Sequence, residues 1–149
     1  MSKRVAIGCD PNASDLKEYI KSSLDEWGYE YTDMGSDDPI YAKVAFKVGE
    51  AVARGEYDRG ILLCGTGIGV SIAANKVPGV YAALCTDVYS AERAVKSNNA
   101  NVMTMGAQTI GPIIARDMVK TYLEADWEPG TRSESKVQAY VEYAKKHQA

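Results

Sequence analysis

Five short apolar runs, each followed by a longer segment of mixed polarity, constrain the fold of this 149-residue chain more than any other feature. The runs lie at residues 4–9, 29–34, 60–64, 80–85 and 101–106. Short runs bounded by polar turn residues are typical of buried strands, whereas the segments between them have helical periodicity. Strands that alternate with helices form a parallel sheet with helices on both faces, joined by right-handed crossovers. The sequence therefore predicts an α/β fold with three layers, α/β/α, around a five-stranded parallel sheet.

Capping residues predict where the first two helices begin. Asn12 is expected to cap the first helix and Gly28 to end it. Asp38 is expected to be the N-cap of the second helix, with Pro39 as its first residue. Further helices are predicted over 70–77, 88–99 and 110–125.

We expect the whole chain, 1–149, to be a single domain, because no linker, internal repeat or low-complexity segment divides it. The tail, from about 126 to 149, contains a turn and a final amphipathic helix. That helix carries more apolar surface than a loose tail needs, from Val137, Tyr140, Val141 and Tyr143. The sequence leaves two placements open: the helix docks on its own domain, or it crosses to a partner subunit.

Charge, hydropathy and cysteine content exclude several classes of function. The net charge is -3, with basic and acidic residues mixed, so we expect no nucleic-acid partner. We find neither a signal peptide nor an apolar stretch near the ~20 residues that span a bilayer, and we therefore expect a cytoplasmic protein without membrane contact. The 3 cysteines match neither a disulfide framework nor a zinc pattern. The single histidine, His147, lies near the end, which excludes histidine catalysis inside the fold and a histidine-based metal site.

The third predicted strand runs into a glycine-rich loop with a cysteine at its start, "LLCGTGIG" at 62–69. Gly65, Gly67 and Gly69 remove side chains where strand turns to helix, so that backbone amides can point at an anion. The anion is either a phosphate or an enediolate oxygen that develops during proton abstraction. Cys64 beside a helix start is favoured as thiolate and can act as nucleophile or base. A glycine turn of purely structural use stays open.

Other polar residues are expected at the same edge, because ligands of an open α/β sheet bind outside the carboxyl ends of its strands. These residues and the remaining cysteines are Cys9, Asp10, Asp33, Cys85, Thr86 and Asp87. We expect Cys9 and Cys85 to be small, inert, buried side chains. Arg132 and Lys136, four apart beside the start of the last helix, either form one basic face for a phosphate or solvate the tail.

Two nucleotide-binding patterns do not fit this loop. The phosphate-binding (Walker) loop of nucleoside triphosphatases requires Gly-Lys-Ser/Thr, but "GTGIGVS" has no lysine. The dinucleotide pattern requires a third glycine at its sixth position, where Val70 stands when Gly65 is the first. A flavodoxin-like nucleotide binder is therefore the weakest interpretation.

Three segments, "VAIGCD", "CGTGIGVSIAANKVPGVYAALCTD" and "SNNANVMTMGAQTIG", resemble the family of B-type ribose-5-phosphate isomerases and galactose-6-phosphate isomerases. The similarity extends to about Ala125, and "CGTGIG…IAANK" is its most specific part. It implies a Rossmann-like fold and a homodimer or dimer of dimers with active sites at the subunit interface. It also implies interconversion of aldose and ketose phosphates through a cis-enediolate, with no metal, nucleotide or other cofactor.

By this resemblance Cys64 is the base that moves a proton between C1 and C2, and Thr66 assists the transfer. Asp10 contacts the sugar oxygens, and the backbone amides of the glycine loop stabilise the enediolate. Asn98 matches a residue near the interface. The remaining expected substrate-binding residues are Gly65, Gly67, Ile68, Gly69, Ser71, Thr86, Asp87, Arg132 and Lys136.

The chain departs from the family pattern at three positions that concern the sugar rather than the proton transfer. Pro11 follows the first-strand aspartate where the family usually has histidine, and Gln108 replaces an arginine. Thr86 stands where a histidine opens the furanose ring, and threonine cannot act as acid or base near neutral pH. Water or Asp87 could take over that role.

The altered residues favour a substrate that needs no ring opening. A tetrose 4-phosphate cannot close a furanose ring through a hydroxyl that carries phosphate, so it competes with ribose 5-phosphate as the substrate. The alternative to an enzyme is a non-catalytic sugar-phosphate-binding subunit of a hetero-oligomer. The retained Cys64 and glycine loop argue against that alternative.

Overall fold

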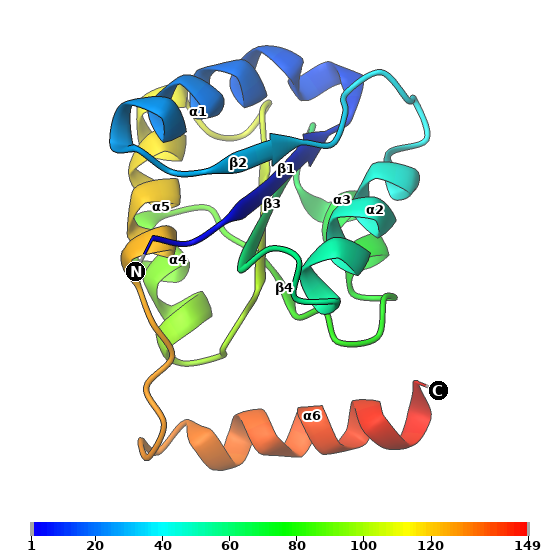
Figure 1. Ribbon diagram of the computed structural model, residues 1–149, viewed down its shortest axis with the longest axis vertical. Coiled ribbons are helices and arrows are strands. Elements are labelled where there is room, and N and C mark those ends of the chain that lie inside the picture. Colours follow the sequence, from blue (N-terminus) through cyan, green and yellow to red (C-terminus); the bar gives the residue numbers. More distant parts are fainter. Residues whose placement is uncertain (1, 149) are drawn as a thin grey trace.

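The computed structural model describes residues 2–148, and it has the α/β architecture that the sequence predicts (Figure 1). One sheet contains five strands: β1 (Val5–Cys9), β2 (Tyr31–Asp33), β3 (Arg59–Cys64), β4 (Ala82–Leu84) and β5 (Val102–Gly106). Their order is β2-β1-β3-β5-β4, and every neighbouring pair is parallel. The predicted five-stranded parallel sheet is confirmed.

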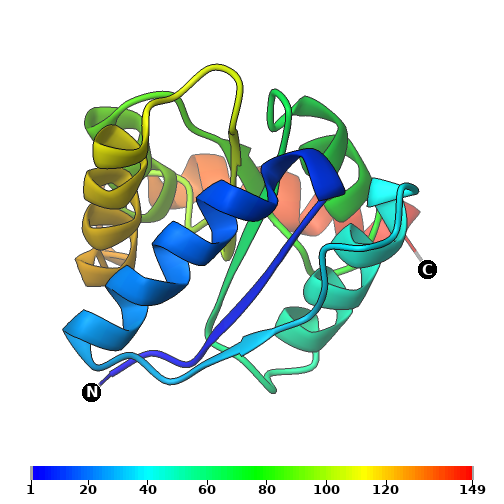
Figure 2. The same cartoon turned by 90° about the horizontal axis from the view of Figure 1, so that it is seen from above.

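Helices cover both faces of the sheet, as a parallel sheet requires (Figures 1 and 2). One face packs against α1 (Ser14–Trp27), α4 (Val88–Lys96) and α5 (Pro112–Glu124). The other face packs against α2 (Tyr41–Ala53) and α3 (Ile68–Ala74). A sixth helix, α6 (Glu134–His147), lies apart from these layers at one end of the domain.

Alternation along the central strands decides which face each cysteine joins. Ile61 and Leu63 of β3 pack with α1, α4 and α5, whereas Leu62 and Cys64 pack with α2 and α3. Cys9, at the end of β1, belongs to the first of these cores. Cys64 is therefore directed toward the helix that its own loop begins, and Cys9 is directed away from it.

Gly28 ends α1 as predicted, but the predicted N-caps of the first two helices are wrong. A short 3₁₀ turn (Pro11–Ala13) precedes α1, and the carboxylate of Asp10, not Asn12, caps it by accepting the Asn12 amide at 3.0 Å. Asp38 accepts the amide of Ile40 at 2.8 Å in a local turn, so α2 begins only at Tyr41. The residue that precedes the first helical residue of α2 is therefore Ile40, two positions after the predicted cap.

An ion pair fixes the carboxyl end of β2 to α1. The ammonium groups of Lys17 and Lys21 each lie 2.9 Å from Asp33, and Lys17 is almost fully buried. Burial alone would raise the pKa of Asp33, but hydrogen bonds from both lysines and the Gly35 amide lower it to about 2. Asp33 is thus engaged in anchoring the helix, although it lies on the predicted ligand edge.

The tail helix α6 contacts its own domain across the edge strand β4. Val137 is buried, the rings of Tyr140 and Tyr81 lie 5.5 Å apart, and the Tyr140 hydroxyl donates to the Asn98 carbonyl. On the neighbouring segment, Asn75 pairs with both backbone groups of Ala82, at 2.8 and 3.0 Å. Crossing of the tail to a partner subunit stays a prediction. Within residues 2–148, no helix is both long enough and apolar enough to cross a membrane.

Candidate active site

Cys64 ends β3, and its sulfur already accepts a hydrogen bond from the loop that follows. The amide of Gly67 donates to Cys64 Sγ at 3.1 Å, and the side chain is almost fully buried. Gly67 has φ +83°, which turns the chain so that α3 begins at the next residue, earlier than the predicted start at 70. The Cys64 sulfur therefore lies at the turn into α3, within hydrogen-bonding distance of a loop amide.

The loop lies directly on β5, and this contact explains why glycine is needed. A Cβ on Gly67 would approach the backbone of Met105 to 2.8 Å, and a Cβ on Gly106 would approach Thr66 backbone atoms to 2.5 Å. Real Cβ atoms do not come so close to backbone, so the loop has no room for side chains at these positions. Gly67 of the loop and Gly106 of β5 therefore set the position of the backbone amides relative to Cys64.

Asp10 and Thr66 lie where the sequence predicted them, beside Cys64. The Asp10 amide donates to the carbonyl of Leu63, the residue before Cys64, at 3.0 Å. Thr66 is exposed at the carboxyl edge, and its hydroxyl oxygen accepts the Ile68 amide at 3.2 Å. The arrangement brings a carboxylate, a hydroxyl and several amides to the edge where the Cys64 sulfur lies.

Two further side chains line the loop, and the sequence analysis did not assign either of them to the site. A Cβ on Gly69 would be only 2.5 to 2.6 Å from the ring and hydroxyl of Tyr41, so this tyrosine covers the loop from the side of α2. A Cβ on Gly65 would likewise lie 3.1 Å from Oε1 of the Gln108 side chain. The predicted second helix begins at Asp38, which places Tyr41 about one helical turn inside the helix. In the structure α2 begins at Tyr41, so this side chain lies at the edge of the sheet.

Cys9 and Cys85 behave as the inert thiols that the sequence predicts. Burial raises the pKa of Cys9 to about 11 and that of Cys85 to about 12. Neither thiol is ionised near neutral pH, so neither competes with Cys64 as a base.

Thr86 and Asp87 lie at the carboxyl edge after β4, but Asp87 has a structural task. Its carboxylate caps α4 by accepting the amide and hydroxyl of Ser90 at 2.7 and 2.8 Å and the hydroxyl of Thr86 at 3.2 Å. These bonds, first that of the Ser90 amide, lower the pKa of Asp87. A carboxylate so engaged is a weak substitute for the histidine that opens a sugar ring.

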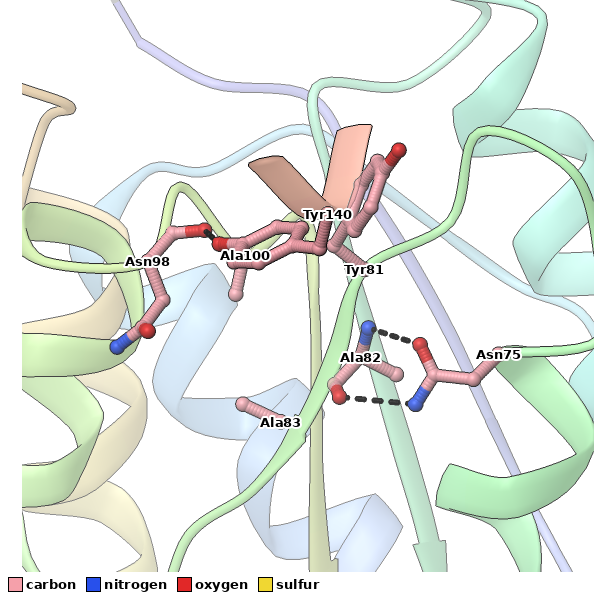
Figure 3. A pocket seen from close by; sticks show the side chains of 7 residues that line it. All are labelled: Asn75, Tyr81, Ala82, Ala83, Asn98, Ala100 and Tyr140. Atoms are coloured by element: carbon pink, nitrogen blue, oxygen red, sulfur yellow. Dashed lines mark hydrogen bonds between the residues drawn. The ribbon is translucent and has the colours of Figure 1, made fainter. Parts of the chain in front are cut away.

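Asn98, Arg132 and Lys136 do not join Cys64 within one chain. Asn98 lies between α4 and the start of β5, which places it at the amino edge of the sheet, opposite the glycine loop. Arg132 and Lys136 are exposed at the start of α6, on the same side (Figure 1). A cavity of about 240 Å³ lies between Asn98 and β4. Figure 3 shows the side chains that line it. Its walls are Asn75, Tyr81, Ala82, Ala83, Asn98, Ala100 and Tyr140.

In residues 2–148, no three or more histidine, cysteine, aspartate or glutamate side chains are grouped as a metal ion would require. The groups that the site does offer are a thiol, a carboxylate, a hydroxyl and backbone amides. A base beside several amide donors is suited to removing a proton next to a carbonyl and stabilising the oxyanion that results.

Comparison with known proteins assigns the fold and this loop to one group. The family model for ribose/galactose isomerase matches residues 5–140. The chain is 47% identical to D-erythrulose-4-phosphate isomerase of Pectobacterium atrosepticum, over 97% of this chain and 98% of the relative. It is 46% identical to ribose-5-P isomerase B of Listeria innocua, over 97% and 99%. Among solved structures, Clostridium thermocellum ribose-5-phosphate isomerase B matches with a TM-score of 0.90 and 41% identity, over 97% and 99%.

Proposed function

The chain belongs to the ribose/galactose isomerase family and is a sugar-phosphate isomerase, and we propose that Cys64 is its base and a four-carbon aldose phosphate its substrate. The observation that carries the first part is the hydrogen bond from the Gly67 amide to Cys64 Sγ, 3.1 Å long. It holds the sulfur beside the backbone amides of the loop, the groups to which we assign the oxyanion.

In the proposed reaction, the Cys64 thiolate removes the proton from C2 of the open-chain aldose. The C2–H electrons form the C1–C2 double bond of a cis-enediolate, and negative charge develops on the former carbonyl oxygen. Amides of the glycine loop stabilise that charge. The Thr66 hydroxyl transfers a proton between the two neighbouring oxygens, and the Cys64 thiol returns its proton to C1, which yields the ketose. Asp10 orients the sugar hydroxyls.

The choice of a four-carbon sugar rests on what surrounds this machinery. The chain has 1 histidine, His147, and it lies in the last turn of α6. The Thr86 hydroxyl donates to Asp87, which itself caps α4. No group of the described site is thus suited to protonating a ring oxygen near neutral pH. The relative from Pectobacterium atrosepticum is named for the ketose of such a tetrose phosphate.

The substrate is tested by NMR in deuterium oxide with erythrose 4-phosphate and ribose 5-phosphate side by side. We expect deuterium at C1 of the ketose and C2 of the aldose, with kcat/KM at least about tenfold higher for the tetrose. Rapid turnover of ribose 5-phosphate without tetrose activity would contradict the choice of substrate. Exchange with neither sugar would instead favour the non-catalytic binding subunit.

We further infer a homodimer that completes each site across its interface. Large apolar side chains surround the loop on α3, β4 and α4, and several are strongly exposed: Ile68 51%, Ile72 58% and Tyr89 71%. Large apolar side chains that are exposed close together mark an interaction surface. A twofold axis perpendicular to the strands sets the amino edge of one subunit beside the carboxyl edge of the other. Asn98, Arg132 and Lys136 then reach the partner's site, where the two cations bind the phosphate.

Co-expression of two inactive variants tests the shared site. Cys64→Ala lacks the base, and the double variant Arg132→Ala/Lys136→Ala lacks the proposed phosphate ligands. If these residues serve opposite subunits, a mixed dimer keeps one intact site, and equal co-expression should restore about a quarter of wild-type activity. The matched control pairs Cys64→Ala with Asp10→Ala. These two residues serve the same site of one subunit, so a mixed dimer has no intact site and no activity should return. Equal results for the two pairs would contradict the arrangement.

A further inference from the structure

A buried hydroxyl on the neighbouring strand is bonded to the catalytic loop. Thr104 lies in the middle of β5, is fully buried, and donates from Oγ1 to the carbonyl of Gly67 at 2.8 Å. Its strand neighbours Met103 and Met105 are apolar and belong to the opposite core. A buried hydroxyl costs free energy unless it is hydrogen-bonded, and the bond to the Gly67 carbonyl satisfies that of Thr104.

The bond determines the orientation of one peptide group. In a trans peptide the carbonyl and the following N–H point in opposite directions, and residues 2–148 contain no cis peptide. Because Thr104 directs the Gly67 carbonyl inward, the Ile68 N–H is directed outward, where Thr66 Oγ1 lies 3.2 Å away. This is the exposed edge at which the proposed enediolate oxygen binds.

The same bond also restrains the amide that contacts the base. Gly67 has two flanking peptide groups: one donates to Cys64 Sγ at 3.1 Å, and the other accepts from Thr104 at 2.8 Å and from the Ser71 amide of α3 at 3.3 Å. Glycine has the widest backbone freedom of any residue, and the Thr104 bond is the shorter of the two that restrain this carbonyl. With φ at +83° and both sides bonded, the Gly67 backbone is confined to one conformation.

We propose that Thr104 is a positioning residue, whose hydroxyl fixes the Gly67–Ile68 peptide group and thereby the amides that face Cys64 and the developing oxyanion. The proposal rests on the proposed function, since the orientation matters for catalysis only if the loop stabilises an enediolate. Thr104 touches neither base nor substrate. Its effect is on transition-state stabilisation more than on binding of the ground state.

The test compares Thr104→Val, which keeps the shape, with Thr104→Ser, which keeps the hydroxyl. We expect Thr104→Val to lower kcat about 10- to 100-fold with less than about threefold change in KM, and Thr104→Ser to restore kcat to within about threefold. A second readout needs no sugar: the rate of iodoacetamide alkylation of Cys64 at one fixed pH, followed by peptide mass spectrometry. That rate should fall at least about threefold in Thr104→Val, because the loop amide beside the sulfur is no longer held in place.

Thr32→Val is the matched control, because Thr32 is also a strand threonine and its hydroxyl is bonded to Tyr57 at 2.8 Å, far from the loop. It should leave both readouts unchanged. If Thr104→Val does not fold, the pair Thr104→Ser and Thr104→Ala decides, since these two side chains differ by the hydroxyl alone. Normal kcat and a normal alkylation rate without the hydroxyl, or equal losses with and without it, would overturn the proposal. A changed alkylation rate in a protein inactive on sugar phosphates would support the loop restraint and refute the proposed function.

Discussion

Replacing Cys64 by alanine should lower kcat about 10³-fold or more and abolish deuterium incorporation at C2 of the aldose. The thiolate is the one group of the described loop that can accept a carbon-bound proton, and the Gly67 amide that bonds to it at 3.1 Å cannot replace it. Serine in the same position should be nearly as inactive, because its hydroxyl is not ionised near neutral pH. Isomerase activity and NMR exchange on the same samples provide the measurement.

Cys85→Ala is the appropriate control for this loss. Cys85 is a buried cysteine near the same edge, and burial raises its pKa to about 12, so it cannot act as a base. Its removal leaves a small cavity that costs about 1 kcal/mol of unfolding free energy, and kcat should stay within about twofold. If Cys64→Ala retained more than a tenth of wild-type kcat, another residue would be the base.

Gly67→Ala should be the most damaging substitution that removes no functional side chain. The added Cβ would approach Leu84 Cδ1 to 2.6 Å and the Met105 backbone to 2.8 Å, and φ is +83°. Left-handed backbone and overpacking together should cost about 2–4 kcal/mol of unfolding free energy. Because strand β5 cannot move, the loop must, and displacement of its amides should lower kcat at least about 100-fold. Thermal unfolding and steady-state kinetics measure the two effects separately.

Gly55→Ala separates the backbone effect from the contact effect. Gly55 has φ +79°, close to that of Gly67, but a Cβ there would meet nothing within 4 Å. It should lose about 1 kcal/mol of unfolding free energy and no activity. If Gly67→Ala lost no more stability or activity than Gly55→Ala, the close contact of the loop with β5 would contribute to neither stability nor catalysis.

The sequence predicts the features of this fold that arise from local patterns. Short apolar runs and glycine spacing are visible in a few consecutive residues, and they suffice to predict the parallel sheet and the loop after Cys64. They also place Asp10 and Thr66 at the correct edge. Helix starts are less accessible, since Asp38 has two possible hydrogen-bonding partners and only the structure shows that it bonds to Ile40. Because the start of α2 depends on this bond, the sequence alone does not indicate that Tyr41 lies beside the loop.

Contacts between distant segments are beyond the sequence patterns. Thr104 and Gly67 are 37 residues apart, and one threonine in an apolar strand gives no sign that its hydroxyl reaches a loop. Asn98, Arg132 and Lys136 show the converse case. They resemble site residues in the sequence, yet within one chain the topology places them at the opposite edge from Cys64. Only the course of the chain in three dimensions separates them.

The glycine loop contributes backbone groups to the site, whereas the side chains beside it come from separate segments. Pro11 precedes α1 and Thr86 follows β4, whereas Gln108 follows β5 and its backbone amide donates to the Gly65 carbonyl of the loop at 3.0 Å. Sugar selection can therefore diverge at Pro11 and Thr86 while the proton-transfer loop is kept. A duplicated gene could acquire a new substrate through a few exchanges on the surrounding turns while inheriting its chemistry unchanged.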